Sequence, residues 1–346
     1  MRLVPVQNLK ENSQIAINII DNEGRFMLKE GQKITSQGIQ ILNRLGVSYV
    51  YINDEYCFHQ GSKKYSSKIE GIYEHIITLR EIGTRIINGT SGATDVTEAT
   101  SVASKIVDEI LLLPKDFKIS YEPNKLIANS LIEQTIYVAM MSTALGIKME
   151  LPKDQLVKLC LAALLKDVAL LSPKIKIDNH AAYRTHPQVA YDYLKAMYDL
   201  NEDILKGVLQ HHELFDGSGF PNQTKGSQIC TFARIISLVD CFYEIKSKHA
   251  FLDSTEMLFE TRLKQILLKF DAEMITYFIR NAEVFTLDTL IRLNNDDIAV
   301  VYENNSTNPF KPVVKIIRSN TYDEGELINL HESHLVIKRI EYYVEG

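Results

Sequence analysis

Several absences narrow the class of protein before any motif is considered. Only four cysteines occur, none in a Cys-x-x-Cys pair, and Cys160 and Cys230 lie in apolar runs. We interpret these cysteines as reduced core thiols, which argues against a disulfide framework or a cysteine zinc site. No apolar run approaches the ~20 residues that a membrane-spanning helix needs. Residues 1–6 are too short and polar for a signal peptide. These absences predict a cytoplasmic chain without a membrane segment.

An excess of positive charge is also missing. The formal net charge is -6 and the isoelectric point is about 5.9, which argues against a surface for a nucleic-acid polymer. What the sequence does have is enough apolar material for buried cores, at 45% hydrophobic residues over 346 positions. This length favours about two to three domains.

Residues 211–221 have the composition of a ligand site. They combine two adjacent histidines, two carboxylates and a Gly-Ser-Gly turn that is closed by Phe220 and Pro221. Neighbouring imidazoles suit zinc, iron or manganese, and Gly217 and Gly219 let the backbone approach a ligand closely. The alternative is a polar helix end that runs into a surface turn, because surface histidines are common.

Other ligand types occur both before and after this segment. Asp167 follows an apolar run at residues 159–165, His186 precedes a proline in a predicted loop, and Asp240 is expected at the end of an otherwise apolar helix. A buried carboxylate needs a partner, and the helices of a bundle could bring these groups to one point. The predicted metal-binding set is Asp167, His186, His211, His212 and Asp240.

With these residues in this order, the region from about 125 to 280 resembles an HD-GYP domain. This family comprises helical metal-dependent phosphohydrolases whose usual members hydrolyse the bacterial second messenger cyclic di-GMP. The resemblance implies one metal held by a first histidine, a His-Asp pair and a last aspartate, and a second metal held by the bridging aspartate and three later histidines. It also implies Asp167 as the catalytic residue of an active protein. The ligand-binding residues that it implies are Lys166, Gly217, Gly219, Phe220 and Pro221.

Four single positions and one short segment depart from the family pattern. Gln134 stands where the first histidine is expected, and Lys166 replaces the histidine of the His-Asp pair. Leu170 replaces a lysine that would be expected to meet substrate phosphate. Phe220 replaces the tyrosine of the family motif, and residues 248–252 replace Asp-Arg-Pro-Tyr-Arg.

These departures affect one metal position and spare the other. The groups that remain could hold a single ion with one carboxylate and three imidazoles. A cation cannot ligate a metal, so the Lys166 ammonium could instead occupy the first position and neutralise Asp167 and Asp240. The alternative is that Lys166 extends into solvent beside an empty pocket. We therefore expect at most one divalent transition metal, namely iron, manganese or zinc, and the alternative of no metal stays open.

Hydrolysis of a phosphodiester in a two-metal site depends on both ions. The rate should therefore fall by orders of magnitude, since each ~1.4 kcal/mol of lost transition-state stabilisation is a factor of ten. We expect a catalytically impaired protein that acts as a signalling receptor or interaction module, with cyclic di-GMP or a partner protein as its ligand. The alternative is an active cyclic di-GMP phosphodiesterase with an altered, single-metal site.

The expected fold is mainly α, with an HD-superfamily helical bundle as core and a small module at each end. Residues 1–54 predict an α+β module with strands at 13–20, 25–28 and 47–52, a turn at 21–24, and a helix that Ser36 caps and Gly46 ends.

Three further segments complete the predicted organisation. Residues 55–124 predict a helical connector, with one helix near 69–79 and another from about 99 to Pro114, and leave a homodimer contact open. Residues 125–283 are the degenerate HD-GYP domain, and residues 284–346 predict a β-rich module with strands at 285–293, 298–302 and 312–317. Both end modules resemble those that accompany HD-GYP domains in Gram-positive bacteria.

Overall fold

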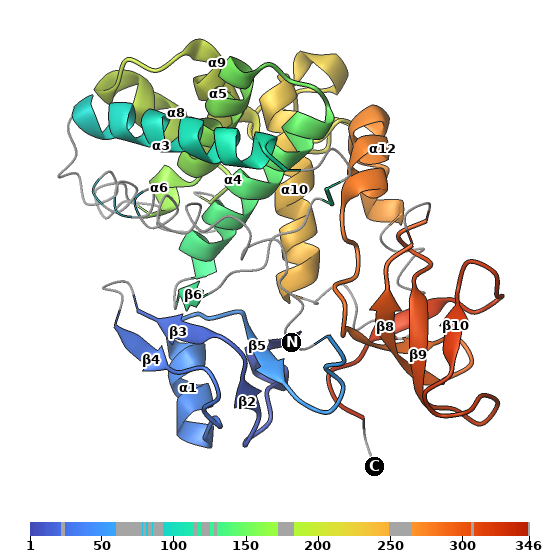
Figure 1. Cartoon of the computed structure of the whole chain (residues 1–346). Helices are drawn as coiled ribbons and strands as arrows, with labels where there is room; N and C mark the ends of the chain where they lie inside the picture. Colours follow the sequence, from blue (N-terminus) through green and yellow to red (C-terminus); the bar gives the residue numbers. More distant parts are fainter. Residues whose placement is uncertain are drawn as a thin grey trace.

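The computed structural model describes residues 1–21, 25–59, 78, 81, 85, 93–113, 117–118, 125–127, 130–171, 183–248, 264–305 and 308–344. A core of helices lies above two β-containing modules, one formed by the first residues and one by the last (Figure 1). The predicted helical core with a small β-containing module at each end is confirmed. No helix within these described ranges is long and apolar enough to cross a membrane.

The amino-terminal module contains two small sheets and one helix. Its elements are β1 (Arg2–Pro5), a 3-10 turn (Val6–Asn8), β2 (Gln14–Ile15), β3 (Asn18–Ile20), β4 (Phe26–Leu28), α1 (Ser36–Arg44) and β5 (Tyr49–Asn53). One sheet has the order β1-β5-β2, and the other has the order β4-β3-β6, in which β6 (Lys125–Ile127) runs parallel to β3. A strand from beyond the predicted connector therefore completes a sheet of this module.

Two local predictions in this module are wrong. The single strand expected at 13–20 is divided between the two sheets, because Ala16 donates its N–H to the carbonyl of Tyr51 and the chain then leaves that ladder. The cap of α1 is Thr35 rather than Ser36: Thr35 has an extended backbone, and its Oγ1 accepts the N–H of Gly38 at 3.2 Å. The predicted turn at 21–24 lies mostly outside the described residues.

The helical core contains α3 (Ala93–Leu111), α4 (Ser130–Lys148), α5 (Lys153–Leu165), α6 (Val168–Leu171), α8 (His186–Met197), α9 (Glu202–Gln210), α10 (Thr231–Lys248) and α12 (Ala272–Asn281). The predicted helix ending before Pro114 corresponds to α3, which packs against α5; Val102 and Ile106, at helical spacing, are buried. The other predicted connector helix lies outside the described residues, apart from residue 78.

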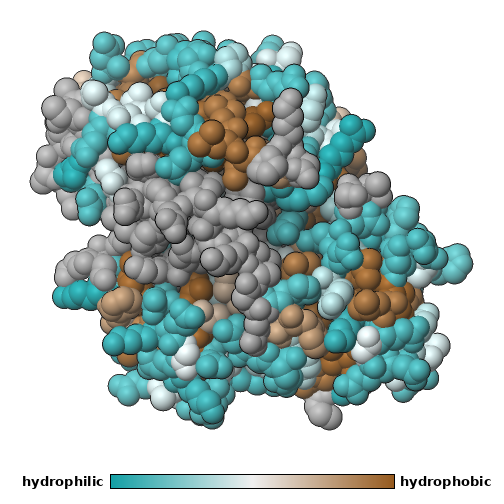
Figure 2. Space-filling model, in the orientation of Figure 1, coloured by the Kyte–Doolittle hydropathy of each residue, from teal (hydrophilic) through white to brown (hydrophobic). Residues whose placement is uncertain are grey.

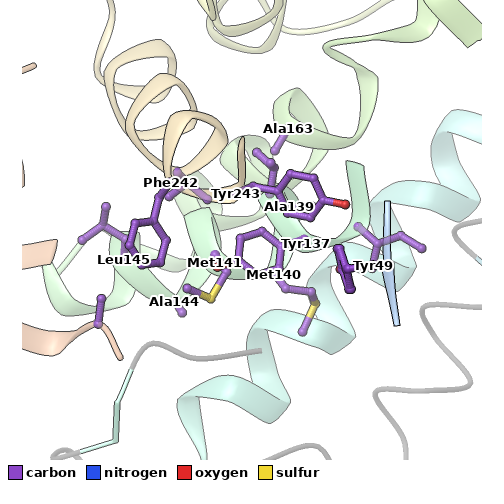
Figure 3. Packing of buried hydrophobic residues seen from close by; sticks show 14 of the residues in the cluster. Tyr49, Tyr137, Ala139, Met140, Met141, Ala144, Leu145, Ala163, Phe242 and Tyr243 are labelled. Atoms are coloured by element: carbon purple, nitrogen blue, oxygen red, sulfur yellow. The ribbon is translucent and has the colours of Figure 1, made fainter. Parts of the chain in front are cut away.

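Helices α4 and α10 meet in a cluster of buried apolar side chains, where Leu145 of α4 lies near Phe242 of α10 (Figure 3). Tyr49 of β5 reaches the same cluster, and its ring lies 6.2 Å from that of Tyr243. The amino-terminal module is therefore packed directly on the helices that carry Gln134 and Asp240.

The carboxy-terminal module is a five-stranded antiparallel sheet. Its strands are β7 (Leu290–Leu293), β8 (Ile298–Glu303), β9 (Val313–Arg318), β10 (Leu327–Asn329) and β11 (Ile337–Ile340), in the order β10-β9-β8-β7-β11. The strand predicted at 285–293 is too long, because residues 286–289 form a turn in which Asp288 has a positive φ of 66°. Strands β10 and β11 were not anticipated. On the face shown in Figure 2, hydrophilic residues cover most of this module and the described surface around it.

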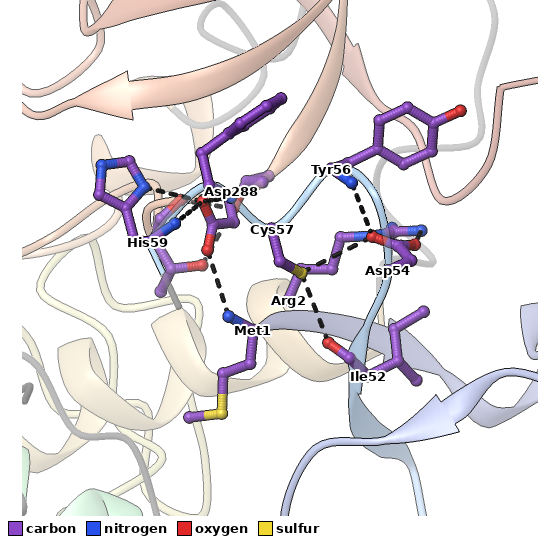
Figure 4. A network of polar contacts seen from close by, with 11 residues as sticks. Met1, Arg2, Ile52, Asp54, Tyr56, Cys57, His59 and Asp288 are labelled. Atoms are coloured by element: carbon purple, nitrogen blue, oxygen red, sulfur yellow. Dashed lines mark hydrogen bonds and ion pairs between the residues drawn. The ribbon is translucent and has the colours of Figure 1, made fainter. Parts of the chain in front are cut away.

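A polar network joins the two end modules (Figure 4). The carboxylate of Asp288, which is 1% exposed, accepts hydrogen bonds from the ammonium of Met1, from the backbone N–H groups of Phe58 and His59, and from Nδ1 of His59 at 2.8 Å. Beside it, the Arg2 guanidinium pairs with Asp54. A buried carboxylate surrounded by donors holds the modules together, because removing it would leave those donors without partners.

We therefore predict that Asp288→Asn lowers the free energy of unfolding by roughly 2 kcal/mol, the scale of a hydrogen bond to a charged group. Asp296→Asn is the matched control: Asp296 also has a positive φ, of 67°, but its ion pair with Lys338 is exposed. The control should change stability by under about 1 kcal/mol. Urea unfolding of both variants measures the difference, and equal losses would contradict the role given to Asp288.

Candidate metal centre

Four side chains from three parts of the helical core converge on one point. One ligand atom from each of Asp167, His186, His211 and His212 lies within 4.8 Å of the other three. Asp167 lies in the turn between α5 and α6, His186 is the first residue of α8 rather than part of a loop, and His211 and His212 directly follow α9. Helix ends supply all four groups, so their positions follow from the packing of the bundle.

The imidazoles of His186 and His211 are oriented by backbone carbonyls. Nδ1 of His186 donates to the carbonyl of Tyr183 at 2.6 Å, and Nδ1 of His211 donates to that of Val208 at 2.7 Å. With Nδ1 protonated, each Nε2 of a neutral ring carries a lone pair. The two Nε2 atoms lie 3.2 Å apart, and they lie 3.1 Å and 3.5 Å from Oδ1 of Asp167.

Three acceptors that face one another at these distances need a positive charge between them. The local electrostatics favour the protonation states that a metal requires. Burial lowers the pKa of His211, although Asp167 opposes this effect. Burial, reinforced by His211, holds the pKa of His212 well below its ordinary value. Burial opposes the ionisation of Asp167, but the Lys166 ammonium outweighs it and holds the pKa of Asp167 well below the usual range. The donor set of one carboxylate and three neutral imidazoles fits zinc, iron or manganese.

The Lys166 ammonium is buried between two carboxylates. The side chain is 0% exposed, it contacts the carboxylate of Asp167, and its Nζ lies 3.2 Å from Oδ1 of Asp240. Burial lowers the pKa of Lys166, but Asp167 and Asp240 outweigh it and raise the pKa above its ordinary value. The alternative in which Lys166 extends into solvent is therefore wrong.

Asp240 faces this cation rather than the four-residue cluster. It lies in the middle of α10, not at the end of a helix as predicted, and its Oδ1 also accepts a hydrogen bond from Nε2 of Gln134 at 2.8 Å. Asp240 is absent from the cluster of converging ligand atoms, although it was predicted as a metal ligand. Gln134 and Lys166, at the two positions where the resemblance leads one to expect histidines, both bind the same carboxylate.

The Gly-Ser-Gly segment forms a close loop beside the cluster. A Cβ on Gly219 would lie 2.4 Å from the backbone nitrogen of Leu214 and 2.5 Å from the carbonyl oxygen of His212. Gly217 has a positive φ of 86°. The backbone path therefore requires glycine at both positions. At Gly219 it brings the loop into direct contact with the backbone of His212.

A buried carboxylate that the sequence reasoning did not single out fixes the far side of this loop. Glu213 is 1% exposed, and its side chain accepts the backbone N–H of Asn222 at 2.7 Å and that of Thr224 at 3.0 Å. Its position directly after the two histidines was the available signal. The role of Glu213 is to hold the loop in place.

A cavity of about 460 Å³ opens beside the cluster. Of the predicted ligand-binding residues, Gly219 and Phe220 line it, and Phe220 stacks on His212 with ring centroids 4.6 Å apart. Lys166, Gly217 and Pro221 do not line this cavity, and the burial of Lys166 keeps it from a ligand there. Further lining residues that the sequence reasoning missed include Tyr183, Arg184, Ser237, Glu244 and Lys269.

Comparison with known proteins identifies the two main parts of the chain. Residues 123–258 match the model of an HD domain, and residues 290–341 match a KOW domain associated with an HD domain. The helical core is therefore an HD domain, as predicted, and the carboxy-terminal sheet corresponds to the KOW domain.

Two curated relatives extend over most of the chain. The chain is 26% identical over 224 residues to cyclic di-GMP phosphodiesterase PdeB of Borreliella burgdorferi, covering 61% of this chain and 58% of the relative. It is 24% identical over 240 residues to cyclic di-GMP phosphodiesterase PA4108 of Pseudomonas aeruginosa, covering 64% of this chain and 56% of the relative. The match thus spans little more than half the length of either relative.

A solved structure, Bd1817, a HDG"Y"P protein from Bdellovibrio bacteriovorus, is 14% identical with a TM-score of 0.47, covering 80% of this chain and 97% of that one.

The family model and the two relatives show that the chain contains an HD domain that is homologous to HD-GYP cyclic di-GMP phosphodiesterases.

The buried charge pair leads to a prediction about stability. Lys166→Met keeps the length and apolar stem of the side chain but leaves Asp167 and Asp240 facing each other in a dry site. We expect the free energy of unfolding at neutral pH to fall by about 3 kcal/mol or more, the range for breaking a buried ion pair. Denaturant unfolding in the presence of a chelator measures this without any contribution from metal.

The contribution of this charge pair to the free energy of unfolding should depend on pH with a definite sign. The lowered pKa of Asp167 stabilises the fold above the unfolded value of about 3.9 and ceases to do so as pH falls through its folded pKa. The raised pKa of Lys166 stabilises the fold below about 10.4 and ceases to do so as pH rises through its folded pKa. The penalty of Lys166→Met should therefore shrink in acid. Lys153→Met, whose ion pair with Asp108 is about half exposed, is the control, and a Lys166 variant no less stable than this control would refute the assignment.

Proposed function

We propose that this chain is a catalytically impaired HD-GYP-type receptor that binds one divalent transition metal and cyclic di-GMP, and that it signals through binding rather than through hydrolysis. The observation that carries the proposal is the placement of the Lys166 Nζ between Asp167 and Asp240. In the HD-GYP family that the chain resembles, a histidine at the place of Lys166 and another at the place of Gln134 are expected to help hold one of two metals. Here the Lys166 ammonium neutralises the same carboxylates and the Gln134 amide donates a hydrogen bond to Asp240, so a second ion would meet a positive charge.

The remaining metal position keeps a complete set of ligands. Asp167, His186, His211 and His212 would hold the ion through one carboxylate oxygen and three ring nitrogens. A bound ion of this type would act as a Lewis acid that polarises a phosphoryl oxygen and lowers the pKa of bound water. The carbonyls of Tyr183 and Val208 keep two of the imidazoles in the tautomer that such an ion needs.

The residues around this position favour binding over turnover. A protonated Lys166 has no lone pair with which to accept a proton from water, and its charge is already used by two carboxylates. Leu170 offers an apolar side chain where a phosphate-facing lysine is expected. A phosphodiester in the cavity would therefore meet one ion and fewer positive charges than the two-metal mechanism requires.

The ligand class is supported by the relatives, both of which are named as cyclic di-GMP phosphodiesterases. The cavity volume of about 460 Å³ lies within the range of small-molecule sites. An active single-metal phosphodiesterase is the competing function, and the assay below separates the two. The cytoplasmic location, the Gram-positive type, the homodimer and a protein partner stay predictions.

We predict that the purified protein binds no more than one equivalent of iron, manganese or zinc. His211→Ala should lose most of this metal, because His211 supplies one of the converging Nε2 atoms. His331→Ala, which changes an exposed histidine of the carboxy-terminal module, should retain it. Elemental analysis after dialysis measures the stoichiometry. Two equivalents that His211→Ala releases together would overturn the single-metal proposal.

We also predict that the protein binds cyclic di-GMP but hydrolyses it orders of magnitude more slowly than an intact phosphodiesterase assayed beside it. The triple variant Gln134→His, Lys166→His, Leu170→Lys should gain activity, and the single changes should gain less, because metal ligands act as a unit. Lys153→His controls for the added histidine. Product analysis by chromatography decides, and hydrolysis by the unchanged chain at the rate of the intact enzyme would favour the competing function.

A further inference from the structure

The cavity beside the metal centre contains two cations that nothing so far accounts for. Arg184 precedes α8, and Lys269 lies in the segment that leads into α12, yet both line the same cavity. Within the described part of the chain, neither side chain forms an ion pair. Two carboxylates, those of Asp240 and Glu244, also line the cavity, and Asp240 is neutralised by Lys166.

A series of contacts between rings connects Arg184 to the candidate metal centre. Its Cζ lies 5.2 Å from the ring centroid of Phe220, and Phe220 stacks on His212 at 4.6 Å. His212 in turn lies 4.2 Å from His211, measured between ring centroids. A guanidinium that lies over an aromatic face keeps the N–H groups at its edge available, and their fork matches the oxygens of a phosphate.

Lys269 provides the second charge from another side of the cavity. Its sequence neighbours Ile266 and Phe270 line the same cavity, whereas Arg184 lies over the ring of Phe220. Cys241 directly follows Asp240 on α10. The two cations thus come from segments far apart in the sequence, and a ligand with two negative groups can pair with both of them.

We infer that Arg184 and Lys269 form a pair of phosphate-binding residues that selects a ligand with two phosphodiester groups over a ligand with one. The inference rests on the proposed function, and it assigns to this chain's own residues the charge that Leu170 and the buried Lys166 do not supply. A cyclic dinucleotide carries two phosphodiesters within one ring, whereas a cyclic mononucleotide carries one. Tyr183, which is exposed, adds aromatic surface on which a base can stack.

The test is calorimetric titration of the full-length protein, as purified with its metal, with cyclic di-GMP and separately with cyclic GMP. Arg184→Gln and Lys269→Gln should each weaken cyclic di-GMP binding by about tenfold or more, the scale of a hydrogen bond to a charged group. Arg184→Lys should recover part of the loss, because it restores the charge but not the fork. Lys206→Gln, an exposed lysine on α9 that does not line the cavity, is the matched control. Circular dichroism establishes that each variant is folded.

The inference is supported if wild type prefers cyclic di-GMP and if both cavity variants, but not Lys206→Gln, reduce that preference. It is overturned if wild type binds cyclic di-GMP and the cavity variants bind it equally well, in which case the proposed function stands. If wild type binds no cyclic di-GMP, the proposed function fails, and titration of the metal-free protein with pyrophosphate tests the cation pair by itself. Pyrophosphate binding that both cavity variants weaken would then support the pair, and its absence would overturn it.

Discussion

The buried contact of the Lys166 ammonium with Asp167 and Asp240 is the interaction on which the site depends. Asp240 is carried by α10, and Asp167 lies between α5 and α6, so the cation joins parts of the core that are far apart in the sequence. Removing three charged groups from water is costly, and the arrangement is tolerable only because each charge has a partner and Gln134 donates a further hydrogen bond. One side of Asp167 is thereby neutralised by the protein itself, while its Oδ1 faces the imidazoles of His186 and His211.

Around that contact, backbone groups do most of the positioning. Carbonyls of Tyr183 and Val208 orient two imidazoles, and Glu213 binds the N–H groups of the loop that follows the histidines. Gly219 permits an approach that any side chain would block. These interactions preserve the shape of a ligand site whether or not it turns over a substrate.

The end modules are not independent of this core. Strand β6 completes a sheet of the amino-terminal module, and Tyr49 packs against Tyr243 one turn beyond Asp240 on α10. Asp288, from the carboxy-terminal side, binds the ammonium of Met1 in the amino-terminal module and donors of Phe58 and His59 just after that module. Contacts therefore run without interruption from the KOW domain to the helix that carries Asp240. This continuity is the physical basis on which ligand binding in the cavity could be transmitted to either end.

Local periodicity and turn residues indicated the modules at both ends, because these are local properties of the sequence. The helical core and a set of five ligands were expected from the resemblance to HD-GYP domains, and four of the five converge in the structure. The sequence also identified Lys166 as a cation out of place, but left open whether it points inward. Only the tertiary structure decided that question, together with the pairing of Asp240 with Lys166 and Gln134 rather than with the histidines. The same holds for the division of residues 13–20 between two sheets and for the meeting of Arg184 and Lys269 at one cavity. Each of these depends on which distant segments pack together, and burial, which sets the cost of an unpaired charge, is a property of that packing and of no single segment.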